Sequence, residues 1–378
     1  MLKRIWSLAI KEFLHLRHNW WLPAFMLIGG AVELLAVGWA TARPITNLPL
    51  MVLDQDRSAA SRAIVENLEE SDTFAIDSYV TTVAAIEDAF REGTISAALM
   101  IPQGFENRLE ADVGEMEGRP TLDFWVDGTE SMAGETAVRE AQEIIQQYAQ
   151  EVVLGRMGLE VEALAGFEPN LTVRYNEDLS AALYTTPAEL ALILEWTVLL
   201  FAALAFSRER ELGTLEQLLV MPFSSFELIV GKSIPAVVIG LADFWLLLAV
   251  IHFAFGVPVR GSLVLLFFLA LGYVMVELGK GLIISLFSRT QHQAFLLVLL
   301  VGMIDFMFTG FAAPVESMPR LLQGIARLVP AYHWLTILRK LLLKGAGLDV
   351  LWVNVAALGV LGLVIGLFAL LYIRRVLD

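Results

Sequence analysis

The 378-residue chain contains no cysteine, and only 18% of its residues are charged. Without cysteine it can form neither a disulfide framework nor a thiolate metal site. The hydrophobic fraction is 57% and the mean hydropathy is +0.66, which is far more apolar than an ordinary soluble domain. This composition favours a membrane protein.

A complete nucleotide-binding motif is also missing. Gly231-Lys232-Ser233 resembles the end of a phosphate-binding loop, but such a loop needs a glycine five residues before Gly231, and that position holds Phe226. No histidine cluster or nucleophile elbow is present either. The sequence therefore predicts no catalytic residue, metal ligand or cofactor site, and energy for any transport must come from a separate protein or an ion gradient.

Lysine is absent from residues 42–187, which carry nine arginines and 27 acidic residues, while the rest of the chain is slightly basic. This contrast indicates an acidic domain inserted into a membrane protein. Short β-rich runs alternate there with helical stretches, which predicts a compact α/β domain. Strands are expected over 48–54, 73–79, 95–101, 121–127 and 171–175, and helices over 58–70, 82–92 and 130–157.

The rest of the chain holds six apolar runs that are long enough to cross a bilayer. They cover 20–41, 188–206, 228–255, 262–287, 292–312 and 349–373. Residues 1–19 have an apolar stripe flanked by basic residues, which predicts an interfacial helix lying on an anionic leaflet. The expected fold class is an α-helical polytopic membrane protein with six transmembrane helices and an α/β extracytoplasmic domain between helices 1 and 2.

Basic residues gather in the segments that share one side of the membrane with both termini. They are Lys3, Arg4, Lys11, Arg17, Arg208, Arg210, Lys232, Arg289, Arg374 and Arg375. The positive-inside rule then predicts cytoplasmic termini, with residues 42–187 outside. Residues 313–348 oppose this rule, because they carry five basic residues although the count of spans places them outside.

A charged and then amphipathic segment joins the second and third spans. Thr214 and Gln217 have the spacing of a capping box, which predicts a short helix that ends at Pro222. Ser224 and Glu227 repeat the spacing and start the next apolar helix. The segment is too short and too polar to cross a bilayer, so we expect it to lie across the membrane surface.

This segment, residues 208–224, carries a family resemblance. The run from Glu209 to Leu218, followed by Met221-Pro222, resembles the E-R-E-x-G-T-x-E-x-L loop of ABC-2 type permeases, the membrane subunits of ABC exporters. Residues 313–348 resemble the external half-helices of the same family. Three short sequences within 42–187 resemble the external domain of its drug-exporter-like subgroup: Asp54–Ser58, Ile101–Phe105 and Val126–Gly128. The implied coupling residues are Glu209, Glu211, Gly213, Thr214, Glu216, Gln217 and Pro222.

The resemblance also implies partners. In this family a coupling helix docks on a separate ATPase subunit that holds ATP and Mg, and two identical or related permease subunits form the pathway. Export is the usual direction, and the location implied is the cytoplasmic (inner) membrane. An extracytoplasmic adaptor is a further candidate partner, and nucleic acid is not expected to bind.

Two other functions stay open from the residues alone. An ATPase-driven signal or mechanical transmitter would act through the large external domain. An ion-coupled secondary transporter would use intramembrane carboxylates as ion or proton sites, but it would not need a surface helix after Glu209, and the sequence shows no internal repeat.

Four carboxylates form the candidate translocation pathway. Glu33, Glu195, Asp243 and Asp305 lie at a similar depth in their spans, which predicts an acidic belt around a central cavity suited to a cationic or amphiphilic cargo. A structural hydrogen bond is the alternative role for each of them. Glu277 is expected to form a structural ion pair with Lys280, which lies one helical turn further on.

Overall fold

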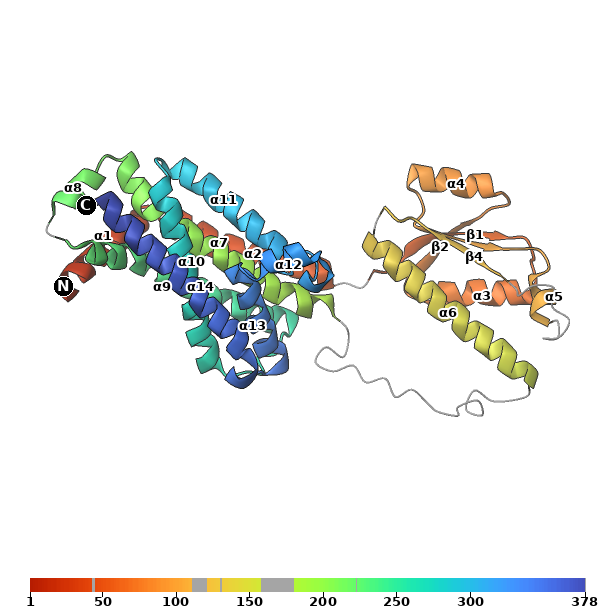
Figure 1. The fold of residues 1–378 in the computed structure, drawn as a ribbon. Coiled ribbons are helices and arrows are strands. Elements are labelled where there is room, and N and C mark those ends of the chain that lie inside the picture. The colour runs from red at the N-terminus through yellow and green to blue at the C-terminus, as the bar shows by residue number, and fades with distance from the viewer. Residues whose placement is uncertain (43–44, 111–120, 130, 158–179, 222, 378) are drawn as a thin grey trace. The chain divides into compact units, whose positions relative to one another are not determined.

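The structure is a computed structural model that describes residues 1–42, 45–110, 121–129, 131–157, 180–221 and 223–377. The chain forms two compact units, shown in Figure 1. The helical unit consists of Met1–Arg43 and Val173–Asp378, and the α/β unit consists of Pro44–Thr172.

The described part of the helical unit contains six helices that are long and apolar enough to cross a membrane. They are α2 (Trp21–Ala42), α7 (Ala181–Glu211), α9 (Ser225–Phe255), α10 (Leu263–Phe287), α11 (Gln291–Phe308) and α14 (Leu348–Leu377). The six expected spans are confirmed as helices. The second begins earlier than its apolar run suggested, because α7 continues through Pro187, and the fifth ends at Phe308 rather than at 312.

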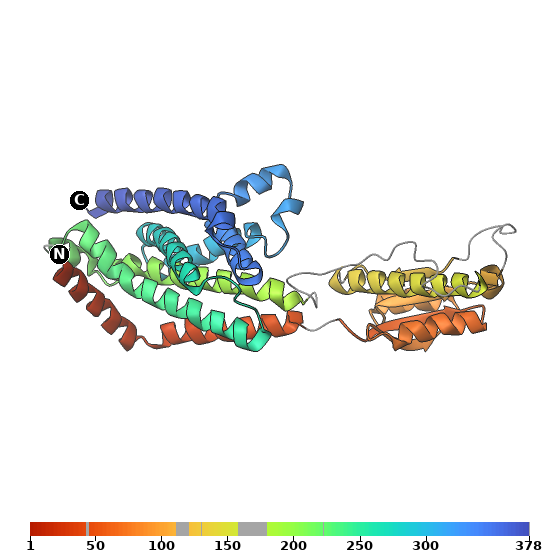
Figure 2. The ribbon, with the colours of Figure 1, turned by 90° about the horizontal axis from the view of Figure 1, so that it is seen from below.

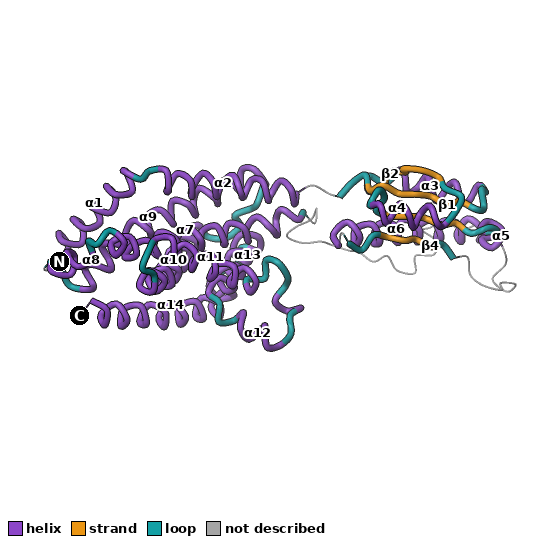
Figure 3. The backbone as a smooth tube through the Cα atoms, turned by 90° about the horizontal axis from the view of Figure 1, so that it is seen from above, coloured by secondary structure: helices purple, strands orange, loops and turns teal. Residues whose placement is uncertain are grey.

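Shorter helices lie at the two ends of this unit. They are α1 (Leu2–His18), α8 (Leu215–Val220), the 3₁₀ helix η2 (Val315–Ser317), α12 (Arg320–Ala326) and α13 (Pro330–Lys344). Figures 2 and 3 show both termini at the same end, and Figure 3 places α8 there too, whereas α12 and α13 lie toward the other end. Helices η2, α12 and α13 occupy the region where half-helices were expected.

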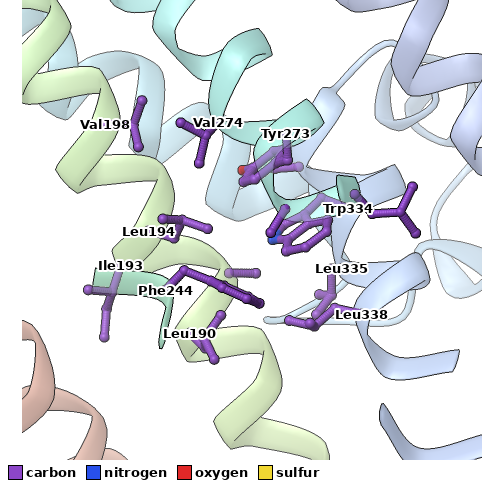
Figure 4. Close-up of a cluster of buried hydrophobic side chains, with 14 of the residues drawn as sticks. Leu190, Ile193, Leu194, Val198, Phe244, Tyr273, Val274, Trp334, Leu335 and Leu338 are labelled. Atoms are coloured by element: carbon purple, nitrogen blue, oxygen red, sulfur yellow. The ribbon is translucent and has the colours of Figure 1, made fainter. Parts of the chain in front are cut away.

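Helix α7 forms the centre of the helical unit. Within its most apolar stretch 83% of the residues are buried, compared with 17% in α2 and 11% in α14. Tyr273 on α10 stacks on Trp334 on α13 with ring centroids 5.0 Å apart and an angle of 11° between the planes. Figure 4 shows core side chains from α7, α9, α10 and α13: Leu190, Leu194, Val198, Phe244, Tyr273 and Trp334. One core therefore holds α2, α7, α9, α10 and α13 together, whereas the buried apolar residues of α11 and α8 belong to separate clusters.

The α/β unit is a four-stranded sheet with helices on both faces (Figure 1). Its strands β1 (Leu48–Asp54), β2 (Phe74–Tyr79), β3 (Ala97–Ile101) and β4 (Asp123–Val126) lie in the order β2-β1-β3-β4, with only β4 antiparallel to its neighbour. Helices α3 (Ala59–Glu70), α5 (Phe105–Glu110) and α6 (Ser131–Met157) cover one face, and α4 (Val83–Glu92) covers the other. Helix α5 was not expected, and the strand expected over 171–175 lies outside the described residues.

Close packing of α7 against α10 depends on Gly281. A Cβ at this position would lie 2.5 Å from the Cβ of Ala202 and 2.8 Å from the backbone oxygen of Leu199. We expect Gly281→Ala to lower the free energy of unfolding by about 1–3 kcal/mol, because the helices must separate. The matched control is Gly272→Ala on the same helix, where the added methyl meets open space. Equal thermal unfolding midpoints for the two purified variants would contradict this packing.

Candidate functional site

The junction between α7 and α8 is a tight turn at Gly213. This residue has a φ of +69°, a conformation that glycine adopts without steric cost, and its amide donates to the carbonyl of Arg210 at 3.2 Å. No atom lies within 4 Å of the position that a Cβ would take. The backbone conformation therefore requires the glycine, whereas the space around it does not.

Thr214 does not cap α8. Its hydroxyl donates to a carboxylate oxygen of Glu209 and makes no capping bond to the backbone of the helix. The capping box predicted for Thr214 and Gln217 is therefore wrong, because the neighbouring carboxylate takes the hydroxyl. The second capping box is confirmed, with Ser224 Oγ accepting from the amide of Glu227 at 3.3 Å and the Glu227 carboxylate accepting from the amide of Ser224 at 2.9 Å.

Glu209 lies inside a cluster of alternating charges that we call the Glu209 cluster. Its members are Lys11, Glu12, Glu209, Thr214 and Lys232. The Oε1 atom of Glu209 accepts from Lys11 Nζ at 2.8 Å and from Lys232 Nζ at 3.0 Å, and Lys232 Nζ also donates to Glu12 at 2.6 Å. Glu209 is only 4% exposed. Its carboxylate therefore joins α1, α7, α9 and the residue that precedes α8, and it is not placed to touch a soluble partner.

The next two residues connect the end of α7 to the turn between α10 and α11. Arg210 Nη1 donates to the carbonyl oxygens of Leu286 at 2.9 Å and Ser288 at 2.6 Å. The Glu211 carboxylate accepts from the amide of Gln291, the first residue of α11, at 2.8 Å. A displacement of this end of α7 would therefore act directly on α10 and α11.

Helix α8 has a fixed side and an open side. Leu218 is buried against Leu8 of α1 and Leu228 of α9, whereas Glu216 and Gln217 are exposed. Val220 is 87% exposed, a large apolar surface at the end of the helix. Glu216 and Gln217 are thus the expected coupling residues on α8 that a partner can reach, and Pro222 lies outside the described residues.

Sequence reasoning missed the partners of Glu209. Lys232 was recognised as part of an incomplete phosphate-binding loop and, like Lys11, as one of the basic residues on the cytoplasmic side. Glu12 was not singled out. A lysine near the start of an otherwise apolar helix was the available signal, because a charge there needs an opposite charge nearby.

A second buried cluster lies between α7, α10 and α11, and we call it the Lys280 cluster. Lys280 Nζ lies 2.7 Å from Glu277, which confirms the expected ion pair. The same nitrogen lies 3.0 Å from Glu195 and 2.5 Å from Asp305. Two of the four carboxylates expected around a cavity are therefore paired with one lysine inside the helix bundle.

The other two candidate carboxylates lie elsewhere. Glu33 lines an apolar pocket of about 740 Å³ between α2, α7 and α11, together with Glu189. Asp243 on α9 is fully buried, and Thr197 of α7 lies beside its carboxylate. The structure thus brings Glu195 and Asp305 together but does not gather all four residues around one cavity.

Comparison with known proteins identifies the family. Residues 20–371 match the ABC-2 family transporter protein family. The chain is 28% identical to the probable multidrug ABC transporter permease YbhR of Escherichia coli K12, with 99% of each chain covered, and 26% identical to the inner membrane transport permease YhhJ of the same strain, with 100% of this chain and 98% of the other covered. It is 24% identical to ABC transporter G family member 20 of Dictyostelium discoideum, over 94% of this chain and 48% of the other. Together with the six apolar helices, this match confirms the resemblance seen in the sequence: the chain belongs to the ABC-2 family of transporters, whose members are the membrane permease subunits of ABC systems.

Proposed function

We propose that this chain couples a separate ATPase subunit to export through α8. The Glu209 cluster is the observation that carries this proposal. It connects the turn that leads into an exposed surface helix to α1, α7 and α9, so a force applied to α8 reaches three helices of the bundle through short polar contacts. ATP and Mg would bind to the partner, because the members of this family are the membrane subunit.

The docking side of α8 is assigned to the cytoplasm. This end of the helical unit holds both termini and α8 (Figure 3). Lys3, Arg4 and Arg17 lie on α1, and Arg289 lies between α10 and α11. An excess of lysine and arginine is typical of cytoplasmic segments. The same rule assigns residues 42–187 to the outside of the cytoplasmic (inner) membrane, where an adaptor protein could reach them.

The cargo pathway is assigned to the pocket between α2, α7 and α11. Its walls are largely apolar and include Phe25, Trp196 and Phe306, while Glu33 and Glu189 supply two carboxyl groups. A cation would pair with these groups, and the aromatic walls would hold its apolar part. YbhR is named a probable multidrug permease, which fits a drug-like cargo, and the two carboxyl groups favour a cationic one.

A second permease subunit would complete this pathway by covering the pocket. Among the candidate carboxylates, Glu33 is the one that we assign to cargo. Glu195 and Asp305 contact Lys280 instead, and Asp243 does not line the pocket, so we assign these three to the structure of the surrounding helices.

Substitution of Gly213 tests the coupling role of α8. Gly213→Val should reduce co-purification of the ATPase subunit and substrate-stimulated ATPase activity several-fold, because a β-branched residue at a φ of +69° costs about 1–2 kcal/mol and would move α8. Gly213→Asn is the matched control, since asparagine tolerates this conformation better. Both variants should elute as folded, monodisperse proteins. Full assembly and full stimulated activity in Gly213→Val would refute the coupling role.

A further inference from the structure

A smaller cavity of about 180 Å³ lies beside the Glu209 cluster, between α1, α7 and α9. Its lining combines polar side chains with an apolar wall. The polar residues include His15, Asn19 and Arg208, and the apolar residues include Leu16, Leu22, Phe201, Leu204 and Ala205. A cavity with both kinds of lining at the end of a membrane bundle suits a molecule that is itself polar at one end and apolar at the other.

The charges around this cavity do not balance. Lys11 and Lys232 are matched by Glu12 and Glu209, and the ion pairs among them are 2.6–3.0 Å long. Arg208 is partly buried, and its guanidinium has no hydrogen bond or ion pair with the residues that the structure describes. One positive charge is therefore left over on the cavity wall, on the side chain best suited to bind an oxyanion with two parallel hydrogen bonds.

His15 adds a hydrogen-bond donor rather than a second charge. Burial lowers the pKa of His15 below its usual value; Glu12 and Glu209 oppose this shift, and Lys11 and Arg208 act in the same direction as burial. The ring is therefore neutral near pH 7 and offers one N–H group to a ligand. Asn19 offers the N–H groups of its amide, and no hydrogen bond of its side chain to the described residues competes for them.

We propose that this cavity binds a phosphate group, with Arg208 as its cationic ligand and His15 and Asn19 as hydrogen-bond donors. The phosphodiester of an anionic phospholipid carries one negative charge, which matches the single surplus positive charge. Its acyl chains would lie against the apolar wall formed by α1, α2 and α7. Basic pockets between membrane helices are suited to lipid head groups for this reason. Free phosphate shares the same chemistry but leaves the apolar wall unused.

Binding to the full chain in lipid nanodiscs tests this site. Discs of phosphatidylcholine alone are compared with discs that also contain phosphatidylglycerol, and the phosphatidylglycerol retained by the protein is measured by native mass spectrometry. Arg208→Gln should reduce retention about tenfold, the loss expected for one charge-assisted contact. Arg17→Gln is the matched control, because Arg17 is an exposed arginine of α1 that does not line the cavity. It should retain the lipid as the wild type does.

Two further experiments distinguish a lipid head group from free phosphate and show whether a loss of binding reflects misfolding. Inorganic phosphate added to phosphatidylcholine discs should raise the thermal unfolding midpoint in an Arg208-dependent way only if the ligand is free phosphate. Arg208→Lys keeps the charge but loses the paired donors, so it should fold normally and retain an intermediate amount of lipid. Equal loss in Arg17→Gln and Arg208→Gln would indicate general attraction to the membrane surface and would overturn the proposal. The absence of any Arg208-dependent response to either source would overturn it as well.

Discussion

Glu209→Gln is expected to lower the free energy of unfolding by about 3 kcal/mol and to weaken assembly with the ATPase subunit. The substitution leaves Lys232, whose side chain is only 1% exposed, with Glu12 as its single counter-ion and removes the contact that holds Lys11. Removal of one partner from a buried ion pair is strongly destabilising because the remaining charge stays out of water. Thermal unfolding and co-purification of the ATPase subunit measure the two effects.

Two controls distinguish the Glu209 cluster from a general effect of charge. Glu211→Gln removes the same charge two residues later, from an exposed position, and should change stability by less than about 0.5 kcal/mol. Glu209→Gln combined with Lys232→Met removes both members of the buried pair and should recover most of the lost stability. If Glu209→Gln were as stable as Glu211→Gln, the cluster would not hold α8 in place.

Lys280→Met should be still more damaging, because three buried carboxylates would then face one another. Glu195, Glu277 and Asp305 each lie within 3.0 Å of the Lys280 ammonium, and no other cation contacts them among the described residues. Unpaired carboxylates inside a membrane cost several kcal/mol. We expect a loss of more than about 3 kcal/mol, seen as a collapse in the yield of monodisperse protein by fluorescence-detected size-exclusion chromatography.

The neutral version of the same cluster is the control. Lys280→Met combined with Glu195→Gln, Glu277→Gln and Asp305→Asn removes every charge of the cluster and should restore the yield of monodisperse protein. A normal yield from Lys280→Met alone would contradict the structural role of the cluster. The double variant Glu195→Gln, Asp305→Asn tests the hypothesis that both residues line the cargo pathway. If it loses cation transport while its stability and ATP binding by the partner are unchanged, both residues would be assigned to that pathway.

Much of the fold follows from local patterns in the sequence. The apolar runs gave six spanning helices, and the strand over 48–54 is β1 with the same bounds. Length and hydropathy determine whether a segment can span, and alternation determines a strand, so neither needs knowledge of distant residues. Helix α5 was not predicted because its six residues are too few to show a helical period.

The candidate site was less predictable because its contacts join distant parts of the chain. Lys11 is 198 residues from Glu209, and Lys280 is 85 residues from Glu195. A residue count gives the depth of a carboxylate in its helix, which is how Glu195 and Asp305 were found. It does not give the neighbour that each helix face meets, and that neighbour decides whether the carboxylate faces a lysine or a cavity.

Cross-linking from α8 tests most directly whether the ATPase subunit docks on this helix. Because the chain contains no cysteine, an introduced thiol is the only one in the permease that can react. Gln217→Cys places one thiol on the exposed side of α8. Ser317→Cys places one on η2, which contacts α12, and α12 lies toward the other end of the helical unit (Figure 3). With a thiol-to-amine cross-linker, Gln217→Cys should form an adduct with the ATPase subunit in the assembled complex, and Ser317→Cys should form none. An intact complex that gives no adduct from Gln217→Cys, or gives one from Ser317→Cys, would contradict docking through α8.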